Sequence, residues 1–256
     1  MSATKYNKLT GKHVLIFGAT SGIGFAVAEA SLASSATLTI TSSSQSRIES
    51  TIQKLTASFP NSQIRGHTCD LSADTIEAGL NALFEKVGAV DHIIYTAADK
   101  IAITPVQDIT RDKIIAAGQL RFIAPMLVAK VGSRYLSPGP ESSITMTTGI
   151  VWERPIPDWT IAAGYAGGIC SMARNLAVDL KPVRVNVVSP GLVDTPFWDG
   201  PLTVEQKEGM FEAYTAKLPT GRIANAEDIA EAYIYLMKDW NATGRVVTTD
   251  SGALIV

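Results

Sequence analysis

The 256-residue chain is predicted to be an α/β protein: a single-domain, Rossmann-like, doubly wound parallel sheet of about seven strands with helices on both faces. Three observations predict this fold. Short apolar runs alternate with amphipathic stretches, a glycine-rich turn follows the first apolar run, and no linker, repeat or low-complexity segment divides the chain. With 46% hydrophobic residues the chain can bury one substantial core, so we expect one domain over 1–256.

The expected elements follow from hydrophobic periodicity. Strands are expected at the short apolar runs 13–17, 36–41, 63–68, 91–96, 143–148, 183–188 and 245–249. Helices are expected at the amphipathic stretches 22–34, 45–58, 74–87, 111–131, 162–180 and 226–238. The segment 190–222 is rich in proline and glycine and interrupts this βαβ alternation. We expect it to form a loop and a short helix over the ligand crevice, because ligands bind beyond the carboxyl ends of such strands.

The glycine-rich turn carries Gly18, Gly22 and Gly24 between the first strand and the first helix. Glycines there let the backbone turn sharply and approach a pyrophosphate, which then lies at the helix N-terminus. After the second expected strand come serines 42–44 and Arg47, with no acidic residue. An acid there is typical of NAD sites, whereas hydroxyls and a cation suit a 2′-phosphate, so NADP(H) is favoured. The alternative is a serine-rich helix cap with Arg47 on a solvated face.

Composition excludes several other classes. The net charge of −2 gives no reason to expect nucleic acid or an anionic membrane as partner. Neither an apolar leader nor an uncharged run long enough to span a bilayer is present, so a cytoplasmic protein is expected. Cys69 and Cys170 are too few for a disulfide framework and are expected to be small buried residues. The three histidines lack ligand spacing, so no metal site is expected.

The glycine-rich turn, Asp70 after the third strand, Tyr165 and the run 184–191 together resemble the short-chain dehydrogenase/reductase family over nearly the whole chain. That resemblance extends to 193–196, which is similar to the loop beside the nicotinamide. From the motifs and the resemblance together, the expected cofactor contacts are Gly18, Thr20, Ser21, Gly22, Ile23, Gly24, Ser42, Ser43, Ser44, Arg47, Asp70, Ala97, Ala98, Val193 and Thr195.

The chain departs from the family at the positions that transfer protons. The family's Tyr-x-x-x-Lys reads Tyr165 to Ile169, its helix asparagine is Gln119, and threonines 147–148 occupy the region of its serine. In the family the lysine holds the ribose and activates the tyrosine. A tyrosine without that cation is a poor acid–base catalyst, forfeiting a factor of about 10² or more. Ordinary carbonyl reduction through the family's relay is therefore not expected.

Three other charged residues are candidates to replace that relay: Asp158 before the expected helix 162–180, Asp99 after the fourth strand, and Arg121. Each also has an ordinary structural interpretation, as a helix cap, a turn residue and an ion-pair partner. The pattern resembles a fungal branch of the family, the NADPH-dependent reductase/Diels–Alderases of indole alkaloid biosynthesis. That resemblance implies Asp158 and Arg121 beside the nicotinamide, with Tyr165 orienting the substrate.

The sequence leaves three functions open. The first is an NADP(H)-dependent oxidoreductase of fungal secondary metabolism, transferring hydride to a large hydrophobic substrate such as an iminium, which needs no accompanying proton. Trp152 and Trp159 would suit a flat aromatic or terpenoid-like substrate, and core packing is their ordinary structural interpretation. The second is a cyclase or isomerase with a structural cofactor, and the third a non-catalytic NADP(H)-binding protein. By analogy with the family, helices 111–131 and 162–180 are expected to form a homodimer or homotetramer.

Overall fold

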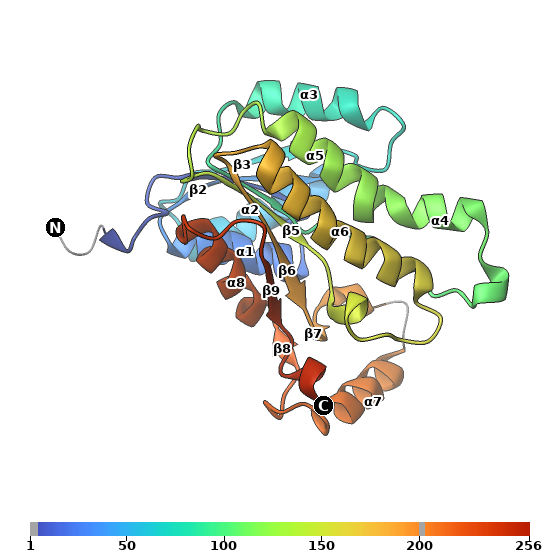
Figure 1. Ribbon diagram of the computed structural model, residues 1–256. Coiled ribbons are helices and arrows are strands. Elements are labelled where there is room, and N and C mark those ends of the chain that lie inside the picture. Colours follow the sequence, from blue (N-terminus) through green and yellow to red (C-terminus); the bar gives the residue numbers. More distant parts are fainter. Residues whose placement is uncertain (1–4, 200–202) are drawn as a thin grey trace.

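A computed structural model describes residues 5–199 and 203–256 and shows a seven-stranded, all-parallel sheet in the order β3-β2-β1-β4-β5-β6-β9 (Figure 1). Its strands are β1 (His13–Phe17), β2 (Thr37–Ser42), β3 (Ile64–Thr68), β4 (His92–Tyr95), β5 (Ser143–Thr147), β6 (Arg184–Pro190) and β9 (Val246–Thr249). The helices are α1 (Gly22–Ala33), α2 (Gln45–Ser58), α3 (Ile76–Val87), α4 (Arg111–Gly118), α5 (Ala124–Gly132), α6 (Thr160–Asp179), α7 (Val204–Thr215) and α8 (Ala226–Lys238).

Helices cover both faces of the sheet, and each face has its own apolar core. Ile16 and Ile40 pack with Tyr233 of α8 on one face, together with α1 and α2. On the other face Leu15 packs with Phe84 of α3, together with α5 and α6. Neighbouring residues of β1 serve opposite cores because side chains alternate along a strand, and a parallel sheet is buried on both sides. The predicted fold class is therefore confirmed.

The predicted elements agree with the structure to within two residues at most boundaries, and two differences matter. The expected helix 111–131 is interrupted by a π-helical turn at Gln119–Ile123. Pro125 is a physical cause, because it has no N–H to continue the i→i−4 ladder. The predicted insertion at 190–222 contains the short strand β7 (Val193–Asp194) and α7, and β7 pairs with β8 (Ala224–Asn225), which periodicity did not predict. Residues 200–202 of that insertion lie outside the described residues.

The continuous run Arg111–Gly132 is long and apolar enough, by length and composition, to cross a membrane. In the structure it packs against α3 and α6 as a covering helix of the sheet, which explains its apolar character. Both cysteines are buried and unpaired, as expected, and burial raises the pKa of each thiol to about 11.

Candidate active site

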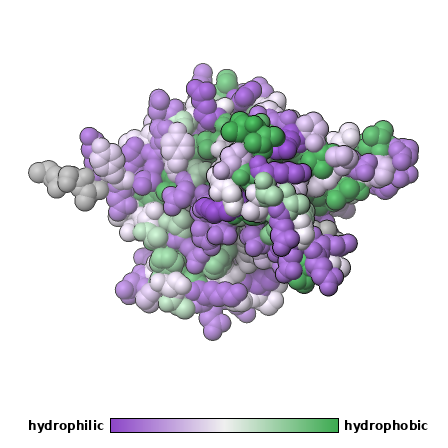
Figure 2. All heavy atoms as spheres, turned by 90° about the horizontal axis from the view of Figure 1, so that it is seen from below, coloured by the Kyte–Doolittle hydropathy of each residue, from purple (hydrophilic) through white to green (hydrophobic). Residues whose placement is uncertain are grey.

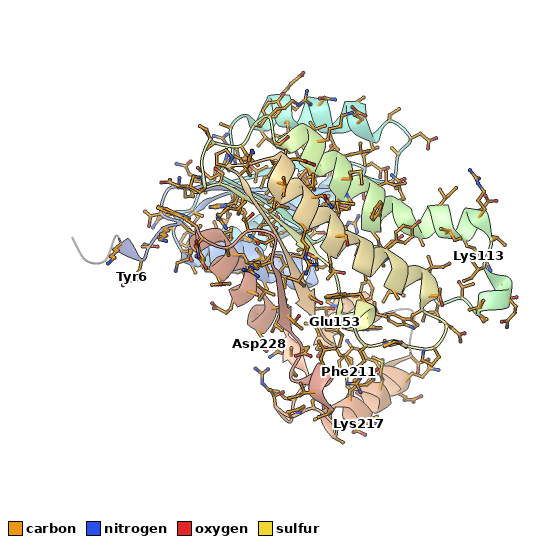
Figure 3. All side chains as sticks on the ribbon, in the orientation of Figure 1. Tyr6, Lys113, Glu153, Phe211, Lys217 and Asp228 are labelled. Atoms are coloured by element: carbon orange, nitrogen blue, oxygen red, sulfur yellow. The ribbon has the colours of Figure 1, made fainter. Side chains whose placement is uncertain are left out.

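A cavity of about 890 Å³ lies beyond the carboxyl ends of the strands. The elements β7 and α7 lie at this end of the sheet (Figure 1). The cavity walls come from the β1–α1 turn, the ends of β2 to β6, the segment between β5 and α6, the first turns of α6, the segment after β6, and α7. Glu153 and Phe211, labelled in Figure 3, stand next to the lining residues Arg154 and Met210 and mark two of these walls. This is the crevice where the sequence predicts the ligand.

The glycine-rich turn has no room for a side chain at Gly18 or Gly24. Gly18 has φ +89°, and a Cβ there would lie 2.6 Å from the backbone nitrogen of Ala97. A Cβ at Gly24 would lie 2.2 Å from the Gly18 carbonyl oxygen and 2.4 Å from Thr96 Oγ1. Ser21, at the N-cap of α1, makes no side-chain capping bond, so it leaves the first N–H groups of the helix to a ligand. Such a cradle of backbone N–H groups fits a pyrophosphate.

The far end of the cavity carries the side chains expected for a 2′-phosphate. Arg47 Nη2 donates to Ser43 Oγ at 3.0 Å, and both residues are solvent-exposed on the cavity wall. Ser44 departs from the predicted cofactor contacts, because it does not line the cavity. Its hydroxyl accepts a hydrogen bond from the Arg47 backbone N–H and caps α2. Asp70 lines the cavity beyond β3, and two hydrogen bonds from Ser72 hold its pKa below the usual range.

Apart from Ser44, every expected cofactor contact lines the cavity. These residues are Gly18, Thr20, Ser21, Gly22, Ile23, Gly24, Ser42, Ser43, Arg47, Asp70, Ala97, Ala98, Val193 and Thr195. Their contacts with the cofactor remain predictions, but all of these residues line one cavity.

Tyr165 lines the cavity, yet its hydroxyl donates to the Ile114 carbonyl oxygen at 2.9 Å, on α4. Its ring packs against Phe122, with ring centroids 5.7 Å apart. The turn of α6 above Thr148 presents Ala162 and Ala166, and Thr148 Oγ1 donates to the Ala166 carbonyl oxygen at 2.9 Å. Among the described residues that line the cavity there is no lysine. This wall therefore offers no tyrosine–lysine pair.

The other hydroxyl groups at the strand ends are also engaged. Thr147 Oγ1 donates to the Tyr95 carbonyl oxygen at 2.6 Å and lies 2.6 Å from the hydroxyl of Tyr233. The Tyr95 hydroxyl donates to Leu120 O at 2.7 Å. Burial raises the pKa of Tyr95 and that of Tyr233 above the ordinary tyrosine value. Gln119, expected at the family's asparagine, donates from Nε2 to Leu71 O at 2.9 Å. These groups support the cavity wall and do not offer it a proton.

Asp158 also departs from its predicted place beside the nicotinamide. It is exposed and does not line the cavity, although its neighbours Pro157 and Trp159 do. The residue has φ +65°, in the left-handed region, which aspartate tolerates better than most residues. Trp152 likewise does not line the cavity; its indole N–H donates to Ser189 Oγ at 3.3 Å.

Of the charged residues proposed to replace the relay, Arg121 is the one that lines the cavity. Its Nη2 donates to the Asp99 carbonyl oxygen at 2.5 Å and lies 3.0 Å from Asp99 Oδ1. Asp99 itself does not line the cavity, so it supports the guanidinium from behind. Arg121 Nε is buried and has no hydrogen-bond partner among the described residues. The structure therefore pairs Arg121 with Asp99, not with Asp158.

Sequence reasoning missed several lining residues in the insertion and the C-terminal segment. Phe197, Trp198, Met210 and Tyr214 form an apolar wall, and Arg154 lines the cavity while donating to the Ala253 carbonyl. The aromatic residues of 190–222 were the signal available, but their orientation depends on how α7 packs back onto the cavity.

Comparison with known proteins agrees with this architecture. A family model described as an SDR-like Rossmann domain matches residues 5–256. The short-chain dehydrogenase/reductase fsr5 of Gibberella fujikuroi is 40% identical, over 99% of this chain and 99% of fsr5. The short-chain dehydrogenase/reductase malC of Malbranchea aurantiaca is 41% identical, over 96% of each chain.

Two solved structures are also similar. The structure of MalC reductase/Diels–Alderase from Malbranchea aurantiaca superposes with a TM-score of 0.93 at 40% identity, covering 98% of this chain and all of the other. A small-chain dehydrogenase crystallised in complex with NADPH superposes with a TM-score of 0.78 at 27% identity, covering 96% of this chain and all of the other. This chain belongs to the short-chain dehydrogenase/reductase family.

Proposed function

We propose that this chain is an NADP(H)-dependent reductase with an atypical active site, acting on a large hydrophobic molecule of fungal secondary metabolism. Its fungal relatives and the reductase at TM-score 0.93 support the reaction class. The cavity of about 890 Å³, with Trp159, Phe197 and Trp198 in its walls, suits a flat, apolar substrate. When bound, NADPH supplies a hydride, and the remaining chemistry falls to this chain's own residues.

The charge of the inner cavity favours one class of hydride acceptor. Arg121 and Arg154 line it, and the only carboxylate among the described lining residues is Asp70, beyond the edge strand β3. A guanidinium stabilises developing negative charge and repels a cation. We therefore propose a conjugated carbonyl as the acceptor, with its oxygen hydrogen-bonded to Arg121. An iminium, which would need a carboxylate beside it, suits this cavity less well than the sequence alone suggests.

The observation that carries this proposal is the Arg121–Asp99 pair. Asp99 holds the guanidinium from outside the cavity, so the donors of Arg121 are pre-oriented and need not reorganise when charge develops on the substrate. A conjugated carbonyl also explains the missing relay. Negative charge that delocalises over an enolate and is held by a guanidinium can take its proton from water after hydride transfer.

A direct test follows NADPH consumption at 340 nm with three probes: benzylideneacetone as enone, α-tetralone as ketone, and N-methyl-3,4-dihydroisoquinolinium as iminium. We expect the enone to react fastest. Arg121→Gln should lower its turnover about 10²-fold, the effect of removing one pre-oriented donor, with NADPH affinity retained. Asp158→Asn is the matched control and should be near wild type, because asparagine tolerates a left-handed backbone. Preferential turnover of the iminium would overturn the acceptor class.

A second candidate is a cyclisation in which the cofactor stays structural. The MalC relative named reductase/Diels–Alderase favours it. Replacing NADPH by NADP⁺ separates the two functions, because a cyclase would still form product with the oxidised cofactor. If NADPH binds tightly and no probe is consumed with either cofactor form, the chain would instead be a non-catalytic NADP(H)-binding protein.

We also expect the chain to work in the cytoplasm as a homodimer or homotetramer. Apolar residues are exposed along η2 (Val106–Asp108), α4, the π-turn and α5, among them Val106, Ile114, Ile115 and Met126. In Figure 2 some apolar side chains lie at the end of the molecule where α4 lies. Sedimentation velocity would measure the oligomeric state, and a monomer at micromolar concentration would contradict the expectation.

A further inference from the structure

The helical run that carries Arg121 is held in an unusual register by side chains from two other segments, the end of β4 and α6. In the π-turn Gln119–Ile123, the Ala124 N–H donates to Gln119 O, five residues back. In a regular α-helix this N–H would instead donate to Leu120 O, so Leu120 O loses its usual donor. Pro125 has no N–H to offer. The Tyr95 hydroxyl, from the end of β4, donates to Leu120 O at 2.7 Å and supplies the missing bond.

Tyr165 braces the same turn from α6. Its hydroxyl donates to Ile114 O at 2.9 Å, before the turn, and its ring packs on Phe122, inside the turn. The ring also lies on Gly118, where an added Cβ would be 2.5 Å from Tyr165 Cζ. The Tyr165 side chain thus contacts the helix both before the π-turn and within it.

The register decides where Arg121 points. An α-helix advances about 100° per residue, so a π-turn changes the phase between the residues before and after it. Closing the turn into a regular helix would rotate Arg121 relative to α4 or α5 by about that angle. Its guanidinium would then leave the cavity wall and Asp99. Pro125 already removes one hydrogen bond of the regular helix, and contacts from other segments can stabilise the turn further against the regular form.

We propose that Tyr165 and Tyr95 are positioning residues that hold the π-turn and thereby direct Arg121 into the cavity. Tyr165 is then not a proton donor, despite its likeness to the family's tyrosine, because its hydroxyl proton is directed to Ile114 O. This assignment rests on the proposed role of Arg121 for its effect on turnover, but not for its effect on the turn.

The primary test is hydrogen–deuterium exchange by mass spectrometry on the full-length protein. Tyr165→Phe and Tyr95→Phe each remove one hydrogen bond, so amide exchange in peptides covering 114–124 should rise about fivefold. Tyr235→Phe, on the exposed face of α8, is the control and should leave these peptides unchanged. Unchanged exchange in 114–124 for both site variants would overturn the proposal, whatever the activity.

Turnover of benzylideneacetone with NADPH separates this inference from the proposed function. A positioning role predicts that Tyr165→Phe lowers kcat by the same factor at every pH between 6 and 9, with NADPH affinity unchanged. An effect confined to one limb of the pH profile would show proton transfer and refute positioning. Faster exchange in 114–124 with unchanged kcat would uphold the bracing but refute the catalytic role of Arg121.

A steric variant tests the packing without relying on the hydroxyl. Gly118→Ala should lower the Tm of the wild-type chain, because its methyl group meets the Tyr165 ring. In a Tyr165→Ala background the same change should lower the Tm much less, since the two sites share a contact. Equal losses in both backgrounds would contradict the proposed brace.

Discussion

The narrowest point of the cofactor cradle is Gly24, and Gly24→Ala is the sharpest test of it. Alanine is the better helix former, and in an open helical position the change would stabilise the protein by about 1 kcal/mol. At Gly24, however, the methyl group would lie 2.2 Å from the Gly18 carbonyl oxygen and 2.4 Å from Thr96 Oγ1. Neither atom is the free end of a flexible side chain, so the backbone must move.

The cost can be estimated from the contacts that would break. Thr96 Oγ1 donates to the Phe17 carbonyl at 2.9 Å, and losing that bond costs about 1 kcal/mol. Overpacking adds about 1–3 kcal/mol. Set against the gain in helix propensity, the net loss in free energy of unfolding is about 1–3 kcal/mol. Because the displaced turn also carries the pyrophosphate contacts, the Kd for NADPH should rise at least about tenfold, equal to 1.4 kcal/mol.

The matched control is Gly79→Ala. Gly79 is exposed on α3, and nothing lies within 4 Å of its added Cβ. It should gain about 0.5–1 kcal/mol and bind NADPH like the wild type. Urea denaturation measures the first quantity and calorimetric titration with NADPH the second. If Gly24→Ala is as stable as Gly79→Ala and binds NADPH equally well, the steric argument for the cradle is refuted.

Three further predictions follow from other parts of the structure. Arg47→Ala should weaken NADPH binding about 10- to 100-fold and leave NADH binding nearly unchanged, since a charge-assisted contact is worth about 1.5–3 kcal/mol; equal losses for both cofactors would contradict 2′-phosphate recognition. Burial lowers the pKa of His92 to about 3, so the unfolded chain binds the extra proton below pH 6.5, and stability should fall from there toward pH 3 by up to about 1.4 kcal/mol per pH unit. Comparing the pH slopes of wild type and His92→Gln in urea checks this, and identical slopes would argue against it. Asp99→Asn should lower kcat with little effect on NADPH binding, because it removes the carboxylate charge beside Arg121 without touching the cradle; a kcat equal to that of the wild type would show that the ion pair is only structural.

The fold and the cofactor were accessible from the sequence because their signals are local. Apolar periodicity reports which residues face the core within one element, and a glycine turn between a strand and a helix has few other uses. The absence of an acid after β2, with Arg47 nearby, indicated the 2′-phosphate for the same reason. Ser44 was misplaced because a serine at that position serves equally well as a helix cap, and local sequence cannot separate the two uses.

Residue chemistry also showed that the tyrosine–lysine pair is missing, and it identified Arg121 as a candidate to replace it. Only the tertiary structure decided which partner Arg121 takes. The family resemblance favoured Asp158, but Asp158 is exposed and does not line the cavity, whereas Asp99, after β4, lies 3.0 Å from the guanidinium. The π-turn was only partly accessible: Pro125 indicates an interruption of the helix, but the contacts from Tyr95 and Tyr165 come from residues distant in sequence. Local patterns determine elements, whereas the direction of a side chain at a site depends on long-range packing that no local pattern encodes.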